Sequence, residues 1–134
     1  MARILFIGID YYDYAARICA AFERLGHAVD FYPIEDRSFS SRTARTLAPK
    51  AYEKRRAAYQ AGLIEQSAGI DYDIVLFIQV HQMRHEAMER LRALHPQARC
   101  ILYIWDARTT LDFRPWGRHF DRVATFDPED ARAL

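Results

Sequence analysis

Nearly continuous apolar runs recur along the chain, and segments with helical spacing separate them. The first run, RILFIGI at Arg3–Ile9, lacks the alternation of a strand with one wet face, which is typical of a strand buried on both faces of a parallel sheet. Five strands are predicted: Arg3–Ile9, His27–Ile34, Asp73–Val80, Arg99–Trp105 and Asp121–Phe126. The second of these, HAVDFYPI, alternates more than the first.

The helical segments carry start and stop signals at their ends. They are predicted at Ala15–Leu25, at Thr43–Gly69, at Arg84–His95 and from Asp127 onward. Gly26 and Pro96 follow the first and third helices as stop signals. Pro49 is expected to break or restart the second helix near its beginning. Asp127 fits the N-cap of the last helix, because Pro128 occupies its first helical position.

Strands and helices therefore alternate along the chain, which predicts the α/β class. Right-handed crossovers place helices on both faces of one open sheet, so we expect a Rossmann-like, doubly wound parallel sheet of about five strands. The strand order expected for such a sheet is 3-2-1-4-5. No linker divides the sequence, so residues 1–134 are predicted to form a single domain.

Composition narrows the classes of function. The 134 residues are 51% hydrophobic and carry a net charge of +1, which argues against a general nucleic-acid binder. No apolar run approaches the roughly 20 residues of a membrane span, so a cytoplasmic location is expected, with peripheral membrane association and homodimer formation left open. Cys19 and Cys100 lie in apolar runs, and no spacing of ligands indicates a metal site.

In an open parallel sheet, ligands bind beyond the carboxyl ends of the strands. The residues that follow the predicted strands are Asp10, Tyr11, Tyr12, Tyr14, Gln79, His81, Gln82, Trp105, Asp106, Arg108, Thr109 and Asp127. Aromatic, acidic and amide groups in this combination suit a hydroxyl-rich ligand such as a sugar. Structural roles compete with this interpretation, because Asp106 and His81 could cap turns or helices and Tyr12 could cover the top of the sheet.

Several nucleotide-binding and catalytic motifs are missing from the sequence. The first strand is followed by neither GxGxxG nor a P-loop, and there is no GxSxG elbow. A phosphoacceptor site of the receiver type needs an acid pair after the first strand and an aspartate at the end of the third. The third strand ends in Gln79, Val80 and His81, which disfavours that site.

Four segments together resemble a known family. They are RILFIGIDYYDYAARICAAFERLGHAVDFYPIEDR, YDIVLFIQ, ILYIWDA and FDRVATFDPEDA. They resemble the N-terminal domain of CgeB-like bacterial glycosyltransferases, and the resemblance covers nearly the whole chain. Its most specific part is the WD pair followed about a dozen residues later by FDRVATFD, whereas Ala107 stands where the family often has serine.

The resemblance implies a GT-B enzyme of polysaccharide biosynthesis, of which this chain is the acceptor-side half. A nucleotide-sugar donor would be bound mainly by a C-terminal domain that the chain lacks, and a glycan would be the acceptor. No cofactor and no metal are expected. Asp106 would be the catalytic base, with His81 and Asp10 as alternatives. The acceptor-binding residues would be Tyr11, Tyr12, Gln79, Trp105 and Arg108.

Two other hypotheses compete with the transferase. One is a stand-alone Rossmann-like module that binds a nucleotide or a sugar without catalysis. The other is an interaction domain in which the Thr43–Gly69 segment docks a partner protein. This last hypothesis predicts an exposed apolar stripe through Tyr52, Tyr59 and Leu63.

Overall fold

A computed structural model describes residues 1–106 and 112–132. The strands are β1 (Arg3–Gly8), β2 (Ala28–Pro33), β3 (Ile74–Ile78), β4 (Arg99–Ile104) and β5 (Arg122–Thr125). The helices are α1 (Tyr14–Arg24), α2 (Phe39–Leu47), α3 (Pro49–Ser67), α4 (His85–Leu94), the 3-10 helix η1 (Arg114–His119) and α5 (Pro128–Arg132). All five predicted strands are confirmed, each one to three residues shorter than the apolar run that indicated it.

The five strands form one parallel sheet in the order β2-β1-β3-β4-β5. The expected order 3-2-1-4-5 is therefore wrong: β3 pairs with β1 rather than with β2. Burial gives the physical reason. Residues 4–8 of β1 are all buried, whereas no residue of β2 is, so the alternating second strand lies at the edge. This is the flavodoxin-like order of doubly wound folds.

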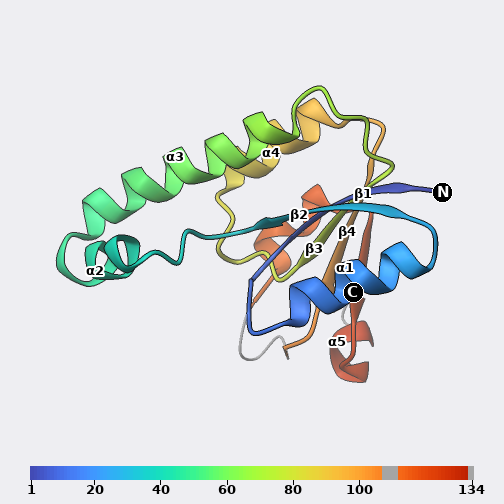
Figure 1. Ribbon diagram of the computed structural model, residues 1–134. Coiled ribbons are helices and arrows are strands. Elements are labelled where there is room, and N and C mark those ends of the chain that lie inside the picture. Colours follow the sequence, from blue (N-terminus) through green and yellow to red (C-terminus); the bar gives the residue numbers. More distant parts are fainter. Residues whose placement is uncertain (107–111, 133–134) are drawn as a thin grey trace.

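Helices cover both faces of the sheet, as predicted (Figure 1). The helices α3 and α4 lie on one face, and α1 and α5 lie on the other. The larger core lies on the first face, where Leu63 and Ile64 of α3 and Met88 and Leu91 of α4 pack against Leu102 and the other inward residues of the strands. The second core is small, with Phe6, Ala15 and Ile78 as its buried members.

The segment between β2 and β3 is a pair of helices. Pro49 restarts the helix as predicted, because α2 ends at Leu47 and α3 begins with Pro49 at its first position. The predicted exposed stripe on this segment is wrong. Leu63 is buried, Tyr59 is half-buried and donates its hydroxyl to the Pro33 carbonyl oxygen at 2.9 Å, and Tyr52 is also half-buried.

The last helix begins as its capping residues indicate. The Glu129 backbone N–H donates to Asp127 Oδ1 at 2.8 Å, which satisfies one of the free donors at the start of α5. None of the helices in the described part of the chain combines the length and the apolar character that crossing a membrane requires.

Candidate functional site

The candidate site lies at the carboxyl ends of β1, β3 and β4. The strand β1 pairs with β2 on one side and with β3 on the other. The connections that leave β1 and β3 therefore run in opposite directions across the sheet, which makes the gap between these strands the topological switch point. Ligands of doubly wound folds bind at this switch point. The residues that leave these strands, Ile9 to Tyr14, Gln79 to His81, and Trp105 with Asp106, therefore converge on one edge of the sheet, as the sequence predicted.

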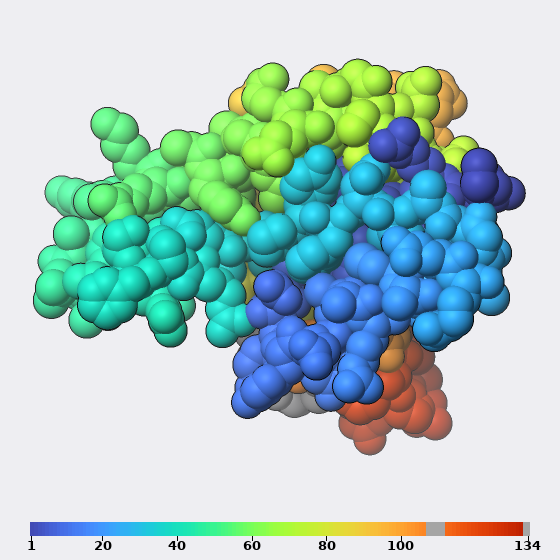
Figure 2. Space-filling model, viewed as in Figure 1, coloured from blue at the N-terminus to red at the C-terminus, as the bar shows by residue number. Residues whose placement is uncertain are grey.

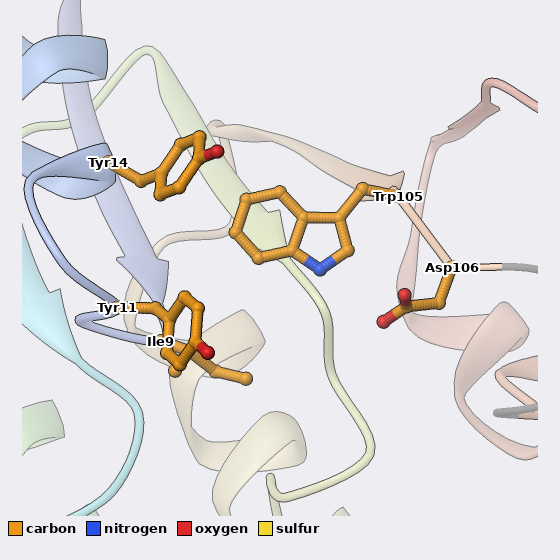
Figure 3. Close-up of a pocket in the computed structure, with 5 residues that line it drawn as sticks. All are labelled: Ile9, Tyr11, Tyr14, Trp105 and Asp106. Atoms are coloured by element: carbon orange, nitrogen blue, oxygen red, sulfur yellow. The ribbon is translucent and has the colours of Figure 1, made fainter.

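A hollow of about 420 Å³ opens at this edge, and Figure 3 shows the residues that line it. The lining residues are Ile9, Tyr11, Tyr14, Trp105 and Asp106. The Tyr14 and Trp105 rings meet edge-to-face with centroids 5.8 Å apart. In Figure 3 the Asp106 carboxylate lies across the hollow from Tyr11, so an aromatic wall faces an acid.

Gln79 joins two of the strand ends beneath this hollow. Its side chain is 3% exposed, and its Nε2 donates a hydrogen bond to Asp106 Oδ2. Its backbone N–H donates to the Tyr103 carbonyl oxygen at 3.2 Å. The amide is thus committed to the protein, and it holds Asp106 in a fixed orientation at the end of β4.

Strained backbone accompanies the same edge. Within residues 1–106 and 112–132, the non-glycine residues with positive φ are Tyr12, at 48°, and Gln79, at 64°. A bulky side chain in the left-handed region costs about 1–2 kcal/mol, and such strain concentrates at functional sites. The two strained residues follow β1 and β3, the strands that flank the switch point.

His81 lies on the neighbouring loop, near Asp106. Burial lowers the pKa of its imidazole, while the Asp106 carboxylate acts in the opposite direction. Gln60 of α3 fixes this loop: its Nε2 donates to the Gln82 carbonyl oxygen at 2.8 Å, and its Oε1 accepts from the Arg84 N–H at 3.1 Å. Gln60 is fully buried, and no sequence motif marked it. Because burial lowers the pKa of His81, the structure favours a neutral His81 imidazole beside the Asp106 carboxylate at neutral pH.

The remaining candidates do not join the hollow. Asp10 is exposed, and its backbone carbonyl, rather than its carboxylate, accepts a hydrogen bond from Arg37. Tyr12 is 79% exposed and lines a second, smaller hollow with Asp13, Tyr14 and Arg17. Arg108 lies outside the described residues. Tyr14, by contrast, does line the hollow, although it was named from the sequence only as a residue that follows a strand.

Within the described residues, no three His, Cys, Asp or Glu side chains gather as metal ligands would. Of the acids at the strand ends, Asp106 is engaged by Gln79, and Asp10 is exposed. The chemistry that the described edge offers is therefore recognition by aromatic and carboxylate groups, with His81 as the nearby titratable base.

The sequence matches no model of a known protein family and no curated protein. Similar solved structures do exist. A response regulator from Burkholderia pseudomallei, solved with a phosphorylated aspartic acid, superposes with a TM-score of 0.55 at 13% identity over 98% of this chain and 65% of its own. The complex of the histidine kinase ThkA with the response regulator TrrA gives 0.53 at 15% identity over 99% and 94%. A Burkholderia thailandensis protein assigned to pilus assembly, CpaE, superposes with a TM-score of 0.50 at 21% identity over 99% of this chain and 96% of its own.

These likenesses show the fold, and they overturn the glycosyltransferase resemblance. The similar structures named above are response regulators and a pilus-assembly protein, not GT-B domains. The prediction of glycosyl transfer in polysaccharide biosynthesis is therefore wrong, and so are the nucleotide-sugar and glycan partners. The alternative of a nucleotide- or sugar-binding module is not supported by these structures either. The error has a physical reason: a parallel sheet followed by acidic and aromatic loops is common to many α/β folds, and such local segments do not distinguish between them.

Proposed function

We propose that this chain is a receiver-like regulatory domain that acts by binding a protein partner and does not accept a phosphoryl group at the candidate edge, the carboxyl ends of β1, β3 and β4. The shared fold over 98–99% of the chain supports the first half, since one of the similar receivers was solved in complex with a histidine kinase. A cytoplasmic location is part of this proposal.

Gln79 carries the second half. An acyl phosphate forms on a carboxylate, and β3 is followed by a carboxamide, which is not a nucleophile for this reaction. The amide is also occupied, because it donates to Asp106 from a buried position. The position after β3, where a receiver is phosphorylated, therefore carries no acceptor carboxylate, and its amide is engaged within the protein. Both observations support regulation by binding rather than by phosphoryl transfer at this position.

The phosphorylation half is tested with acetyl phosphate and Mg²⁺, with intact mass as the measurement. The expected result is no added phosphoryl group on the wild-type chain. A phosphoryl adduct on the wild type that disappears in Asp106→Asn or Asp10→Asn would overturn this half, and the variant that loses the adduct would identify the acceptor.

The binding half is tested with a photo-cross-linking residue in the source cells. Tyr11, at the candidate edge, is 47% exposed, and Leu94, at the end of α4 and thus at the opposite edge of the sheet, is 43% exposed. A cross-linker at Tyr11 is expected to give one discrete protein adduct that the same cross-linker at Leu94 does not give. Equal, diffuse labelling from both positions would contradict a partner at this edge.

A further inference from the structure

The positive charge of this chain is concentrated in one short segment. Residues 37–56, RSFSSRTARTLAPKAYEKRR, contain seven of the 19 basic residues and one of the 18 acidic residues. The segment therefore carries a net charge of +6, and the other 114 residues carry −5, which together give the +1 of the whole chain. We call residues 37–56 the basic arm.

The arm extends beyond what the core requires. At 1.5 Å per residue the 19 residues of α3 span about 28 Å, whereas a six-residue strand spans about 20 Å. The buried residues of α3 are Gln60, Leu63, Ile64 and Ser67, all in its second half. The first half and α2, whose one buried residue is Ser41, project from the body in Figures 1 and 2. The chain passes from the carboxyl end of β2 into α2, so the arm lies beside the candidate edge, where the carboxyl ends of the strands meet.

Most of the arm's cations have no acidic partner. Arg42, Arg45, Lys50 and Lys54 are exposed, and none of them forms a salt bridge with a residue of the described ranges. Arg56 pairs with Glu53 within α3 at 3.3 Å. The unpaired cations point to a role outside the fold, since like charges four residues apart on a helix, such as Lys50 and Lys54, destabilise it.

The arm also exposes large apolar side chains. Phe39 is 80% exposed and Leu47 is 77% exposed, at the two ends of α2. The base of this helix is held firmly, because Asp36 accepts from the Ser41 hydroxyl at 2.6 Å and from the Ser38 N–H at 2.9 Å. These hydrogen bonds lower the pKa of Asp36, the bond from Ser41 most.

We propose that the basic arm is the docking surface for an acidic segment of the partner protein, one that also carries apolar side chains to cover Phe39 and Leu47. The proposal rests on the protein-binding function proposed above and names the partner's chemistry. Complementary charge would steer the encounter, and the apolar contacts would add affinity at short range.

Two observations favour a protein segment over a polyphosphate or an anionic membrane. A polyphosphate has no apolar groups, so it would leave the exposed side chains of Phe39 and Leu47 uncovered. The edge beside the arm presents Asp10, Asp13 and Asp106, which would repel an extended anionic surface, whereas a short acidic segment need touch the arm alone.

The test uses the full chain and three fluorescent probes: a synthetic helix of glutamate and leucine, a short DNA duplex, and vesicles rich in phosphatidylserine. The peptide is expected to bind most tightly, and its affinity should fall as salt is added. Reversal of two cations in Arg42→Glu/Arg45→Glu should weaken peptide binding by about tenfold or more. The matched reversal Arg24→Glu/Arg122→Glu, outside the arm, should weaken it by less than about twofold.

A second pair of reversals separates docking from folding. Lys50→Glu/Lys54→Glu reverses two cations near the start of α3, and Lys50 lies in the first turn, where the helix dipole favours an acid. Circular dichroism of this variant, with the helix signal of the wild type, would show that loss of binding does not come from a melted helix. The proposal is overturned if the peptide does not bind at low salt, if DNA or vesicles bind more tightly, or if the two control reversals weaken binding as much as the arm reversals. Such a failure would leave the phosphorylation and cross-linking results untouched, so it is distinguishable from failure of the proposed function.

Discussion

The side-chain amide of Gln79 donates a hydrogen bond to the carboxylate of Asp106, and this contact joins the carboxyl ends of β3 and β4. Gln79 follows directly on β3, Asp106 is the second residue after β4, and Gln79 is almost fully buried. A buried amide needs a partner, so the pair stabilises the edge as well as shaping it.

Removing the acceptor should therefore cost more than removing its charge. In Asp106→Ala the buried Nε2 of Gln79 loses its partner, and the free energy of unfolding should fall by about 1–3 kcal/mol. In Asp106→Asn the carboxamide oxygen still accepts, so the loss should stay below about 1 kcal/mol. Urea denaturation of both variants checks this. Equal losses would mean that the hydrogen bond contributes little to stability.

Relief of the strain at Tyr12 should stabilise the protein. Its φ is 48° and its side chain is largely exposed. The substitution Tyr12→Asn therefore removes few contacts, and asparagine tolerates the left-handed region better than tyrosine. The free energy of unfolding should rise by about 0.5–1 kcal/mol in urea denaturation. The control is Tyr14→Asn, which loses the edge-to-face contact with Trp105 and should lower stability. A destabilised Tyr12→Asn would show that the Tyr12 ring, packed edge-on against Tyr11, outweighs the strain.

Stability should fall as the pH is lowered below the ordinary histidine pKa near 6.5. Burial lowers the pKa of His95, against a smaller opposing effect of Asp71, and burial likewise lowers the pKa of His81 and His119. Below pH 6.5 the unfolded chain binds protons that the folded chain does not, so the free energy of unfolding decreases as the pH falls through this range toward the lowered pKa values.

The variant His95→Gln isolates one of these histidines. His95 Nε2 lies 2.9 Å from the Ser67 hydroxyl, and glutamine can replace that contact without titrating. Urea denaturation at pH 7.5, 6.5 and 5.5, roughly spanning the histidine range, should give a shallower loss of stability for His95→Gln than for the wild type. The same loss in both proteins would exclude His95 as a contributor.

The two thiols should differ in reactivity. Burial raises the pKa of Cys100 to about 12 and also raises the pKa of Cys19, which is only half-buried. A thiol reagent at neutral pH should therefore modify Cys19 slowly in the folded protein and Cys100 only after denaturation. The variant Cys19→Ser should show no reaction until it is unfolded. Rapid modification of Cys100 in the folded protein would contradict its place in the core.

Part of the candidate site was readable from the sequence because it depends on where strands end. The positions after β1, β3 and β4 identified Tyr11, Gln79, Trp105 and Asp106, which the structure brings together. The roles were not readable, because side chains of these types suit several ligands. The basic arm was readable as a count of charges over residues 37–56, although the near-zero net charge of the chain concealed it.

The sequence by itself determined the α/β class and the five strands, because a strand buried on both faces has a continuous local run of apolar residues, such as RILFIG or IVLFI. Only the tertiary structure decided that β3 lies beside β1, since parallel pairing joins segments about 70 residues apart and leaves no local pattern. That pairing brings Tyr12 and Gln79 to one edge, and the position of β4 beside β3 then supplies Asp106 to Gln79. The site therefore follows from strand order, which long-range packing rather than local sequence sets.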